Sequence, residues 1–139
     1  MNMQKQSLWA IGFGCRTLAS TEAIIAAVLA TLAKAKSEGA SPCAYQLFTL
    51  ASKAQHAPSH EAAQRLGVAL RFLKPEEMRP FMEGTTYNSA RVEALVGIGS
   101  VAEAAALAGA GCGSRLLVPR MVHEGVSAAL AAAGEGVPS

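Results

Sequence analysis

LWAIGFGCR, residues 8–16, is the stretch that decides the fold of this chain. It begins as a continuous apolar run, which is typical of a strand buried on both faces of a parallel sheet. Gly12 and Gly14 then indicate a tight turn, and Ser20 is a good N-cap for a helix with Glu22 in its first turn. The stretch therefore predicts the strand, turn and helix that open a β-α unit.

Apolar runs and helical patterns alternate along the rest of the chain. Further strands are expected at Tyr45–Ala51, Val68–Phe72, Val96–Gly99 and Arg115–Val118, and helices at Ser20–Gly39, Pro58–Leu66, from Pro75, at Ser89–Leu95 and from Ser100 up to Gly109. Pro119 is expected to end the strand before it. Gly125–Ala133 is ambiguous, because its alanines favour a helix whereas Val126-Ser127 favours a strand. The alternation predicts an α/β fold in three layers (α/β/α), with a mostly parallel sheet of about five or six strands and helices on both faces.

Length and composition favour a small, soluble, single-domain protein that does not bind nucleic acid. The 139 residues fit one domain, residues 1–139, in which 134–139 form a frayed tail. The formal net charge is only +2, so we expect no nucleic-acid binding. No apolar run reaches the roughly 18 residues of a membrane span. Residues 8–14 are at the short limit for the apolar region of a signal peptide, and they contain two glycines. We therefore expect a cytoplasmic protein that binds no membrane, and the oligomeric state stays open.

The pair Gly12 and Gly14 resembles the start of a dinucleotide-binding fingerprint. The third glycine would fall at Thr17, and no suitable acid lies about 20 residues further on, since Glu38 ends a helix. We interpret the pair as a tight turn whose backbone can approach a ligand. No cofactor is expected.

Cys15 and Arg16 stand at the end of the same strand. A cysteine nucleophile needs a nearby base, and the sequence places none, so packing is the better explanation of Cys15. Arg16 can pair with a carboxylate through two hydrogen bonds or stay solvated.

Two further patterns also have structural explanations. His56 and His60 are four residues apart, but Pro58 places His56 before the helix, so no metal site is expected. Glu103 is the third residue after Ser100, which matches a capping box.

Several segments, taken in order, resemble the cobalamin-biosynthesis family that includes CobE and the C-terminal domain of CbiG. They are Ala10–Arg16, Leu50–Lys53, Ser89 with Val92, Val96 and Gly97, Ser100–Leu107, Leu116–Arg120 and Val126–Leu130. The set spans nearly the whole chain, and it favours an edge strand at residues 126–130. Since only this unit is present, the chain most resembles stand-alone CobE of the aerobic branch.

The chain departs from the family pattern at three places. The family often has an acidic residue soon after Lys53, where this chain has His56 and its neighbours, which puts an acid–base role of that loop in doubt. The closing lysine of the family is Arg120 here, and its threonine is Ser127, so charge and hydroxyl are kept.

The resemblance implies a step in building the corrin ring. CbiG proteins open a ring lactone on a cobalt-precorrin and release acetaldehyde. Precorrins are flat, apolar in the middle and ringed with carboxylates, so their site needs cations and helix N-termini around an apolar floor. Strand ends gather at one rim of such a sheet, where we expect the substrate-binding residues. They are Gly12, Gly14, Cys15, Arg16, Ser52, Lys53, Ser89, Ser100, Val101, Glu103 and Arg120.

Three hypotheses follow. The first is that the protein binds or hands on a precorrin-type tetrapyrrole intermediate. The second is hydrolysis of a precorrin ring lactone, in which Glu103 or a histidine activates water, and the missing clear base counts against it. The third is a non-catalytic interaction module for another enzyme of the cobalamin pathway. The sequence determines neither the intermediate nor whether it contains cobalt.

Overall fold

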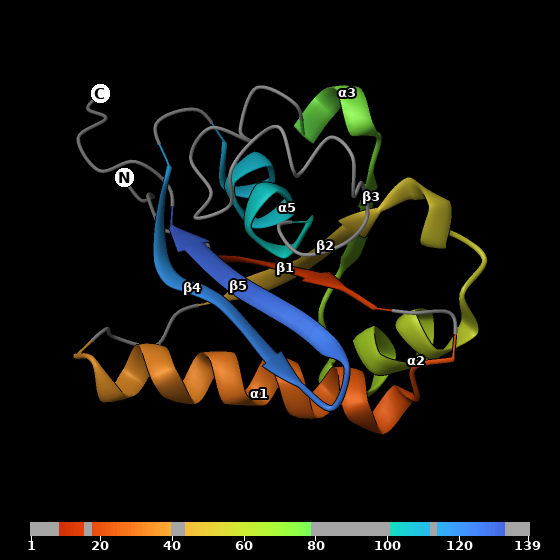
Figure 1. Cartoon of the computed structure of the whole chain (residues 1–139), viewed down its shortest axis with the longest axis horizontal. Coiled ribbons are helices and arrows are strands. Elements are labelled where there is room, and N and C mark those ends of the chain that lie inside the picture. Colours follow the sequence, from red (N-terminus) through yellow and green to blue (C-terminus); the bar gives the residue numbers. More distant parts are fainter. Residues whose placement is uncertain (1–8, 16–17, 40–43, 79–100, 112–113, 133–139) are drawn as a thin grey trace.

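The computed structural model describes residues 9–15, 18–39, 44–78, 101–111 and 114–132, and has an α/β fold (Figure 1). Its elements are β1 (Trp9–Gly14), α1 (Thr21–Ser37), β2 (Tyr45–Leu50), the 3₁₀ turn η1 (Ala51–Lys53), α2 (Ala57–Leu66), β3 (Leu70–Leu73), α3 (Pro75–Met78), α5 (Val101–Ala110), β4 (Arg115–His123) and β5 (Val126–Ala132). The expected elements at Ser89–Leu95 and Val96–Gly99 lie outside the described residues. None of the helices in the described ranges is long and apolar enough to cross a membrane.

The described strands form one five-stranded sheet in the order β3-β2-β1-β5-β4. β1, β2 and β3 are parallel, but β5 runs antiparallel to both β1 and β4. The sheet is mixed, so the prediction of a mostly parallel sheet was wrong. The reason is the two-residue turn between β4 and β5, in which Glu124 and Gly125 have φ values of 54° and 83°. Two consecutive positive φ values are typical of a tight β-hairpin, which forces the strands to be antiparallel.

β5 resolves the ambiguity at Gly125–Ala133, because these residues form a strand despite their alanines. The strand was expected at an edge, yet it lies between β1 and β4. Its side chains are almost all buried, since helices pack on both of its faces. Small residues suit such a position because they let a helix backbone approach the sheet.

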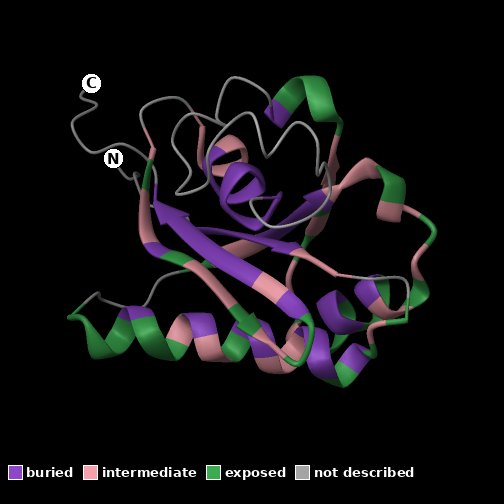
Figure 2. Cartoon of the chain, in the orientation of Figure 1, coloured by how far each residue is buried: buried purple, intermediate pink, exposed green. Residues whose placement is uncertain are grey.

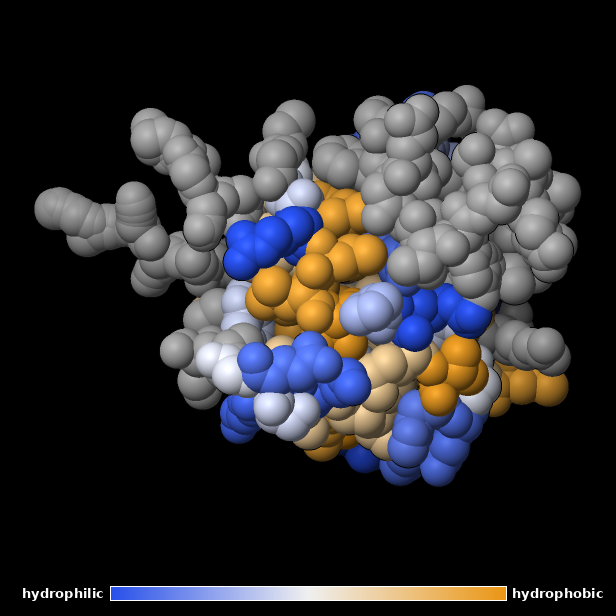
Figure 3. Space-filling model, turned by 60° about the vertical axis from the view of Figure 1, so that its left-hand side comes forward, coloured by the Kyte–Doolittle hydropathy of each residue, from blue (hydrophilic) through white to orange (hydrophobic). Residues whose placement is uncertain are grey.

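β4 extends through Pro119, where the sequence predicted an end. Among the strands that the structure describes, β4 pairs with β5 alone, and its register shifts on both sides of Val118. Proline is tolerated on edge strands and at bulges, where its missing N–H breaks no ladder bond. Figure 3 shows hydrophobic side chains at the surface on the side where β4 lies, with hydrophilic side chains around them. One exposed apolar residue of β4 is Val122, which is 59% exposed.

Both faces of β1 are covered by helices (Figures 1 and 2). Ile11 and Phe13 are fully buried in a cluster that includes Ile24 and Val28 of α1. Ala10, on the opposite face, packs in a second cluster with residues of α3 and α5. This two-sided burial explains why the strand reads as a continuous apolar run.

Two predicted helix ends are confirmed. The hydroxyl of Ser20 accepts a hydrogen bond from the Ala23 amide at 3.0 Å, as an N-cap does. Gly67 ends α2 with a φ of 71°, a conformation that glycine adopts without strain.

Gly12 is the point at which α5 lies directly on the sheet. A Cβ atom added at Gly12 would collide with the Ala102 carbonyl oxygen and lie 2.5 Å from the Ala106 amide nitrogen. A similar contact occurs at Gly109, where an added Cβ would lie 2.6 Å from the ring of Phe48. The close packing of α5 therefore accounts for a glycine at this position of β1.

We expect Gly12→Ala to be more destabilising than Gly109→Ala. The first places a methyl group against helix backbone, which cannot move alone, and costs about 3 kcal/mol, at the upper end of overpacking effects. The second meets a ring that can shift, and it gains about 1 kcal/mol of helix propensity. Urea unfolding of both variants measures the difference, and equal losses would contradict the backbone contact.

Candidate functional site

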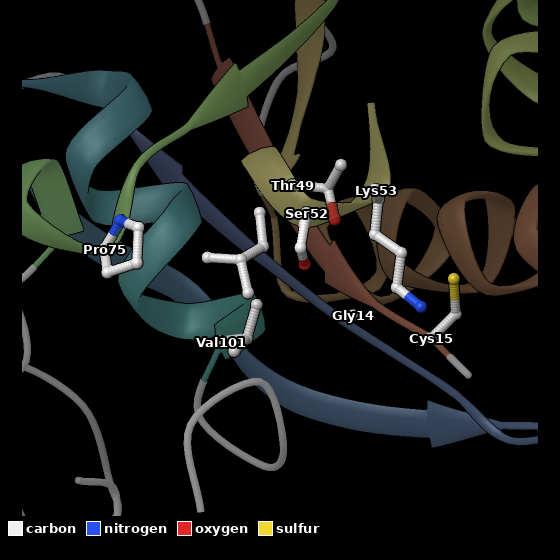
Figure 4. Close-up of a pocket in the computed structure, with 8 residues that line it drawn as sticks. Gly14, Cys15, Thr49, Ser52, Lys53, Pro75 and Val101 are labelled. Atoms are coloured by element: carbon white, nitrogen blue, oxygen red, sulfur yellow. The ribbon is translucent and has the colours of Figure 1, made fainter. Parts of the chain in front are cut away.

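A pocket of about 390 Å³ opens where β1 and β2 end (Figure 4). It is lined by Gly14, Cys15, Thr49, Leu50, Ser52, Lys53, Pro75 and Val101. These residues come from four separate parts of the chain: the end of β1, the end of β2 with η1, the start of α3 and the start of α5. Strand ends and helix starts thus meet at one rim, as expected for an α/β sheet.

The pocket opens because β1 and β2 separate there. Their parallel pairing ends at Gly12 and Phe48. Beyond this pair, the buried hydroxyl of Thr49 donates a 2.7 Å hydrogen bond to the Phe13 carbonyl. The side chain of Thr49 therefore gives the Phe13 carbonyl a hydrogen-bond donor just beyond the last paired residues of the two strands.

One wall of the pocket is apolar and the other carries polar groups. Leu50, Pro75 and Val101 contribute the apolar surface, and Ser52 and Lys53 the polar surface. Val101 is the first residue of α5, so the N-terminal end of that helix, which carries a partial positive charge, lies at the pocket. Together with the lysine, it makes this end of the sheet suitable for an anion.

Cys15 lies at the rim of the pocket, and Figure 4 shows the amine of Lys53 directed toward its thiol. Burial raises the pKa of the Cys15 thiol, whereas the charge of Lys53 and a hydrogen bond with Ser59 partly offset that rise. The thiol is therefore largely protonated at neutral pH, and it loses its proton only with the help of a base.

A histidine lies near this rim that sequence reasoning did not connect with Cys15. The Nδ1 atom of His56 lies 2.7 Å from the Ser59 hydroxyl, and Ser59 is one of the groups that lower the pKa of the Cys15 thiol. Ser59 is fully buried. The only indication of this proximity in the sequence was the expected alternation of strands and helices, which places the end of β1 and the start of α2 at the same end of the sheet.

His56 and His60 do not form a pair. The Nε2 atom of His60 lies 2.7 Å from the Ala54 carbonyl oxygen, whereas His56 bonds Ser59. The described ranges contain no group of three or more residues that could hold a metal ion.

The remaining predicted residues lie away from the pocket or outside the description. Gly12 is covered by α5, and Glu103 and Arg120 do not line the pocket. Arg16, Ser89 and Ser100 lie outside the described residues, although their neighbours Cys15 and Val101 line the same pocket as Lys53.

Glu103 joins α5 to the irregular part of β4. Its side chain is fully buried, and its Oε2 atom accepts a 2.9 Å hydrogen bond from the Arg120 amide, next to Pro119. The carboxylate thus gives this amide a buried acceptor next to the point at which the register of β4 shifts. The predicted capping box needs Ser100, so it remains a prediction.

Comparison with known proteins identifies the family. The family model described as "Cobalamin synthesis G C-terminus" matches residues 9–131. The chain belongs to the CobE/CbiG C-terminal family. The resemblance predicted from the sequence is thereby confirmed.

Two solved structures are similar to this family member over most of its length. CobE, a protein from the cobalamin (vitamin B12) biosynthetic pathway, is 31% identical with a TM-score of 0.78, covering 95% of this chain and 94% of that chain. The cobalamin biosynthesis protein chiG from Agrobacterium tumefaciens str. C58 is 32% identical with a TM-score of 0.68, covering 91% and 99%. No curated protein sequence gives a significant match.

In this family member, we expect Glu103→Leu to destabilise the fold and Glu103→Gln to do so much less. Leucine removes the acceptor of the Arg120 amide, and losing such a buried hydrogen bond costs about 1–3 kcal/mol, whereas the glutamine oxygen still accepts it. Urea unfolding measures both changes. A leucine variant as stable as the parent chain would show that the carboxylate has no structural role.

Proposed function

We propose that this chain binds a carboxylate-rich tetrapyrrole intermediate of cobalamin biosynthesis and hands it on. The observation that carries the proposal is the pocket itself, which combines Lys53 and the start of α5 with the apolar side chains of Leu50, Pro75 and Val101. An edge of such a macrocycle presents the same combination, with a carboxylate beside an apolar ring. Family membership supports the pathway.

The size of the pocket agrees with partial insertion of the ligand. Its volume lies within the range of about 300–1,000 Å³ found for small-molecule sites. A flat macrocycle inserted by one edge leaves its other edges accessible. That arrangement suits a protein that passes its ligand to an enzyme.

Apolar contact supplies most of the expected affinity. Micromolar binding needs about 8 kcal/mol, whereas one exposed ion pair contributes only about 0.2–1 kcal/mol. Burial of about 25 cal/mol per Å² of apolar surface fills most of the difference. The charge on Lys53 then serves mainly to orient the carboxylate.

Two other roles remain candidates. Hydrolysis of a precorrin ring lactone is favoured by one observation, the thiol of Cys15 at the rim of the pocket together with the hydrogen-bonded Ser59 and His56. The third role is an interaction module for another enzyme of the pathway.

One experiment separates the three roles. The purified protein is mixed with precorrin intermediates, and the visible spectrum and the mass of the tetrapyrrole are recorded. A shifted spectrum with an unchanged mass supports binding, and a changed mass supports catalysis. No change in either, with co-purification of a pathway enzyme, supports the interaction role and overturns the binding proposal.

We expect Lys53→Met to weaken tetrapyrrole binding by up to about fivefold, which corresponds to about 1 kcal/mol for one ion pair. The matched control is Lys36→Met near the far end of α1, which removes the same charge without touching the pocket. Spectroscopic titration measures both affinities at one salt concentration. Equal affinities of the two variants would show that the ligand does not use Lys53. Arg16→Ala, which removes the charge next to Cys15, is expected to weaken binding in the same titration.

A further inference from the structure

The sheet splits between β1 and β2 before either strand ends. Their shared register stops at Gly12 and Phe48. β1 nevertheless continues to pair with β5 as far as Gly14, and β2 continues to pair with β3 as far as Leu50. The two strands therefore diverge inside an otherwise continuous sheet, and Gly14 and Leu50 both line the pocket that opens between them.

The backbone pattern of β2 fixes the direction of the Leu50 amide. The Leu47 amide donates a 2.9 Å hydrogen bond to the carbonyl of Ala69, just before β3, and the Ala44 carbonyl accepts one of 2.9 Å from Trp9 of β1. Adjacent residues of a strand direct their backbone groups to opposite neighbours, so the even-numbered residues of β2 face β1. The amide of Leu50 therefore points toward β1 at the place where the two strands have separated.

A side chain stands where this amide would find its partner in a regular sheet. The register of β1 and β2, continued by one step, directs the Leu50 amide to the carbonyl of Phe13. In this structure, that carbonyl accepts a 2.7 Å hydrogen bond from the fully buried hydroxyl of Thr49. The hydroxyl thus occupies the acceptor that a continued ladder would give to Leu50.

We propose that the hydroxyl of Thr49 releases the backbone amide of Leu50 from the sheet, and that this amide donates a hydrogen bond to a carboxylate of the ligand. The inference rests on the proposed function for its ligand and deepens it, because it adds a backbone contact to the same pocket. Lys53 follows in η1 and lines the pocket together with Thr49 and Leu50 (Figure 4). One short segment thus offers a carboxylate both a directed amide and a positive charge.

The amide supplies what the lysine lacks. The ammonium group of Lys53 sits on a flexible stem, whereas the backbone at Leu50 is held by its pairing with Leu73 of β3. The neighbouring lining is apolar, with Pro75 and Val101 close to Leu50 in the same pocket. A hydrogen bond is stronger where apolar surface excludes water, so the amide fixes the orientation of a carboxylate that the lysine attracts.

The first test uses the full chain without a tetrapyrrole. Hydrogen exchange of the ¹⁵N-labelled protein, followed by NMR and corrected for intrinsic rates, compares the amides of Leu50 and Phe48. We expect Leu50 to exchange at least about tenfold faster, because Phe48 lies in the paired part of β2. Sodium acetate in place of sodium chloride at constant ionic strength is expected to move the Leu50 amide proton downfield and to leave that of Phe48 in place.

Either of two results overturns the proposal at this stage. A Leu50 amide that exchanges as slowly as that of Phe48 belongs to a continued ladder. A Leu50 amide proton that does not respond to acetate is no donor for carboxylates.

The decisive variant is Leu50→Pro, which removes the amide hydrogen. Leu50 has φ −73° and ψ 143°, values that proline adopts without strain. The matched control is Leu50→Ala, which shortens the same side chain and keeps the amide. We expect the proline variant to bind the tetrapyrrole about tenfold more weakly than the alanine variant, as for the loss of one hydrogen bond to a charged group. Spectroscopic titration measures both affinities, and equal values overturn the contact.

Thr49→Val gives a second measurement if melting curves show that the proline variant is unfolded. Valine has the shape of threonine but no donor, so we expect the Leu50 amide to return to the Phe13 carbonyl, with slower exchange and weaker tetrapyrrole binding. The matched control is Thr31→Val, because the buried hydroxyl of Thr31 donates a 2.8 Å hydrogen bond to the Ala27 carbonyl within α1, away from the pocket. Exchange and affinity that stay unchanged in Thr49→Val overturn the role of the hydroxyl.

Failure of this inference differs from failure of the proposed function. Tetrapyrrole binding by the parent chain, with equal affinities of Leu50→Pro and Leu50→Ala, removes the amide contact and leaves the proposed function. A parent chain that binds no tetrapyrrole, but whose Leu50 amide responds to acetate, removes the proposed function and supports this donor for another carboxylate ligand.

Discussion

The rest of the structure depends on the direct contact between the backbone of α5 and Gly12 of β1. Because β1 carries no side chain there, the helix lies closer to the sheet than ordinary side chains allow. The same helix begins at Val101, which lines the pocket. It also brings the carboxylate of Glu103 to the amide of Arg120. The many buried alanines of α5 and β5 fit this close packing, because their side chains are small.

The pocket follows from the separation of two strands rather than from a specialised loop. Thr49 takes over the hydrogen bonding of Phe13 where the pairing of β1 and β2 stops, and η1 then carries Lys53 to the opening. The parallel β-α connections bring the start of α2 to the same rim. A thiol, an ammonium group and an imidazole thus gather from segments that are about 40 residues apart in sequence at most. Such a gathering is a property of the topology and not of any one motif.

The sequence was sufficient for the parts of the fold that depend on local signals. The apolar run at the beginning predicted β1, and the hydroxyl of Ser20 and the glycine at 67 predicted two helix ends. The order of the segments predicted the family. Of the predicted binding residues, Gly14, Cys15, Ser52, Lys53 and Val101 do line one pocket, although no ligand tests their role.

The errors have a common physical origin in contacts between distant segments. The hairpin turn at Glu124-Gly125 was not recognised, so β5 was placed at an edge and the sheet was taken as mostly parallel. The helix that covers Gly12 was likewise not foreseen, because nothing in the local sequence shows it. The hydrogen bond between His56 and Ser59 was not anticipated either, because only the start of α2 in three dimensions brings these side chains together.

The outer border of β4 has a consequence for how molecules of this protein meet one another. Pro119 has no N–H, and the N–H of the next residue, Arg120, is already used by Glu103. β4 therefore lacks one backbone donor at Pro119 and has a second one occupied by Glu103. Such a strand is a poorer template for regular pairing with a strand of another molecule than an unbroken ladder of donors and acceptors is.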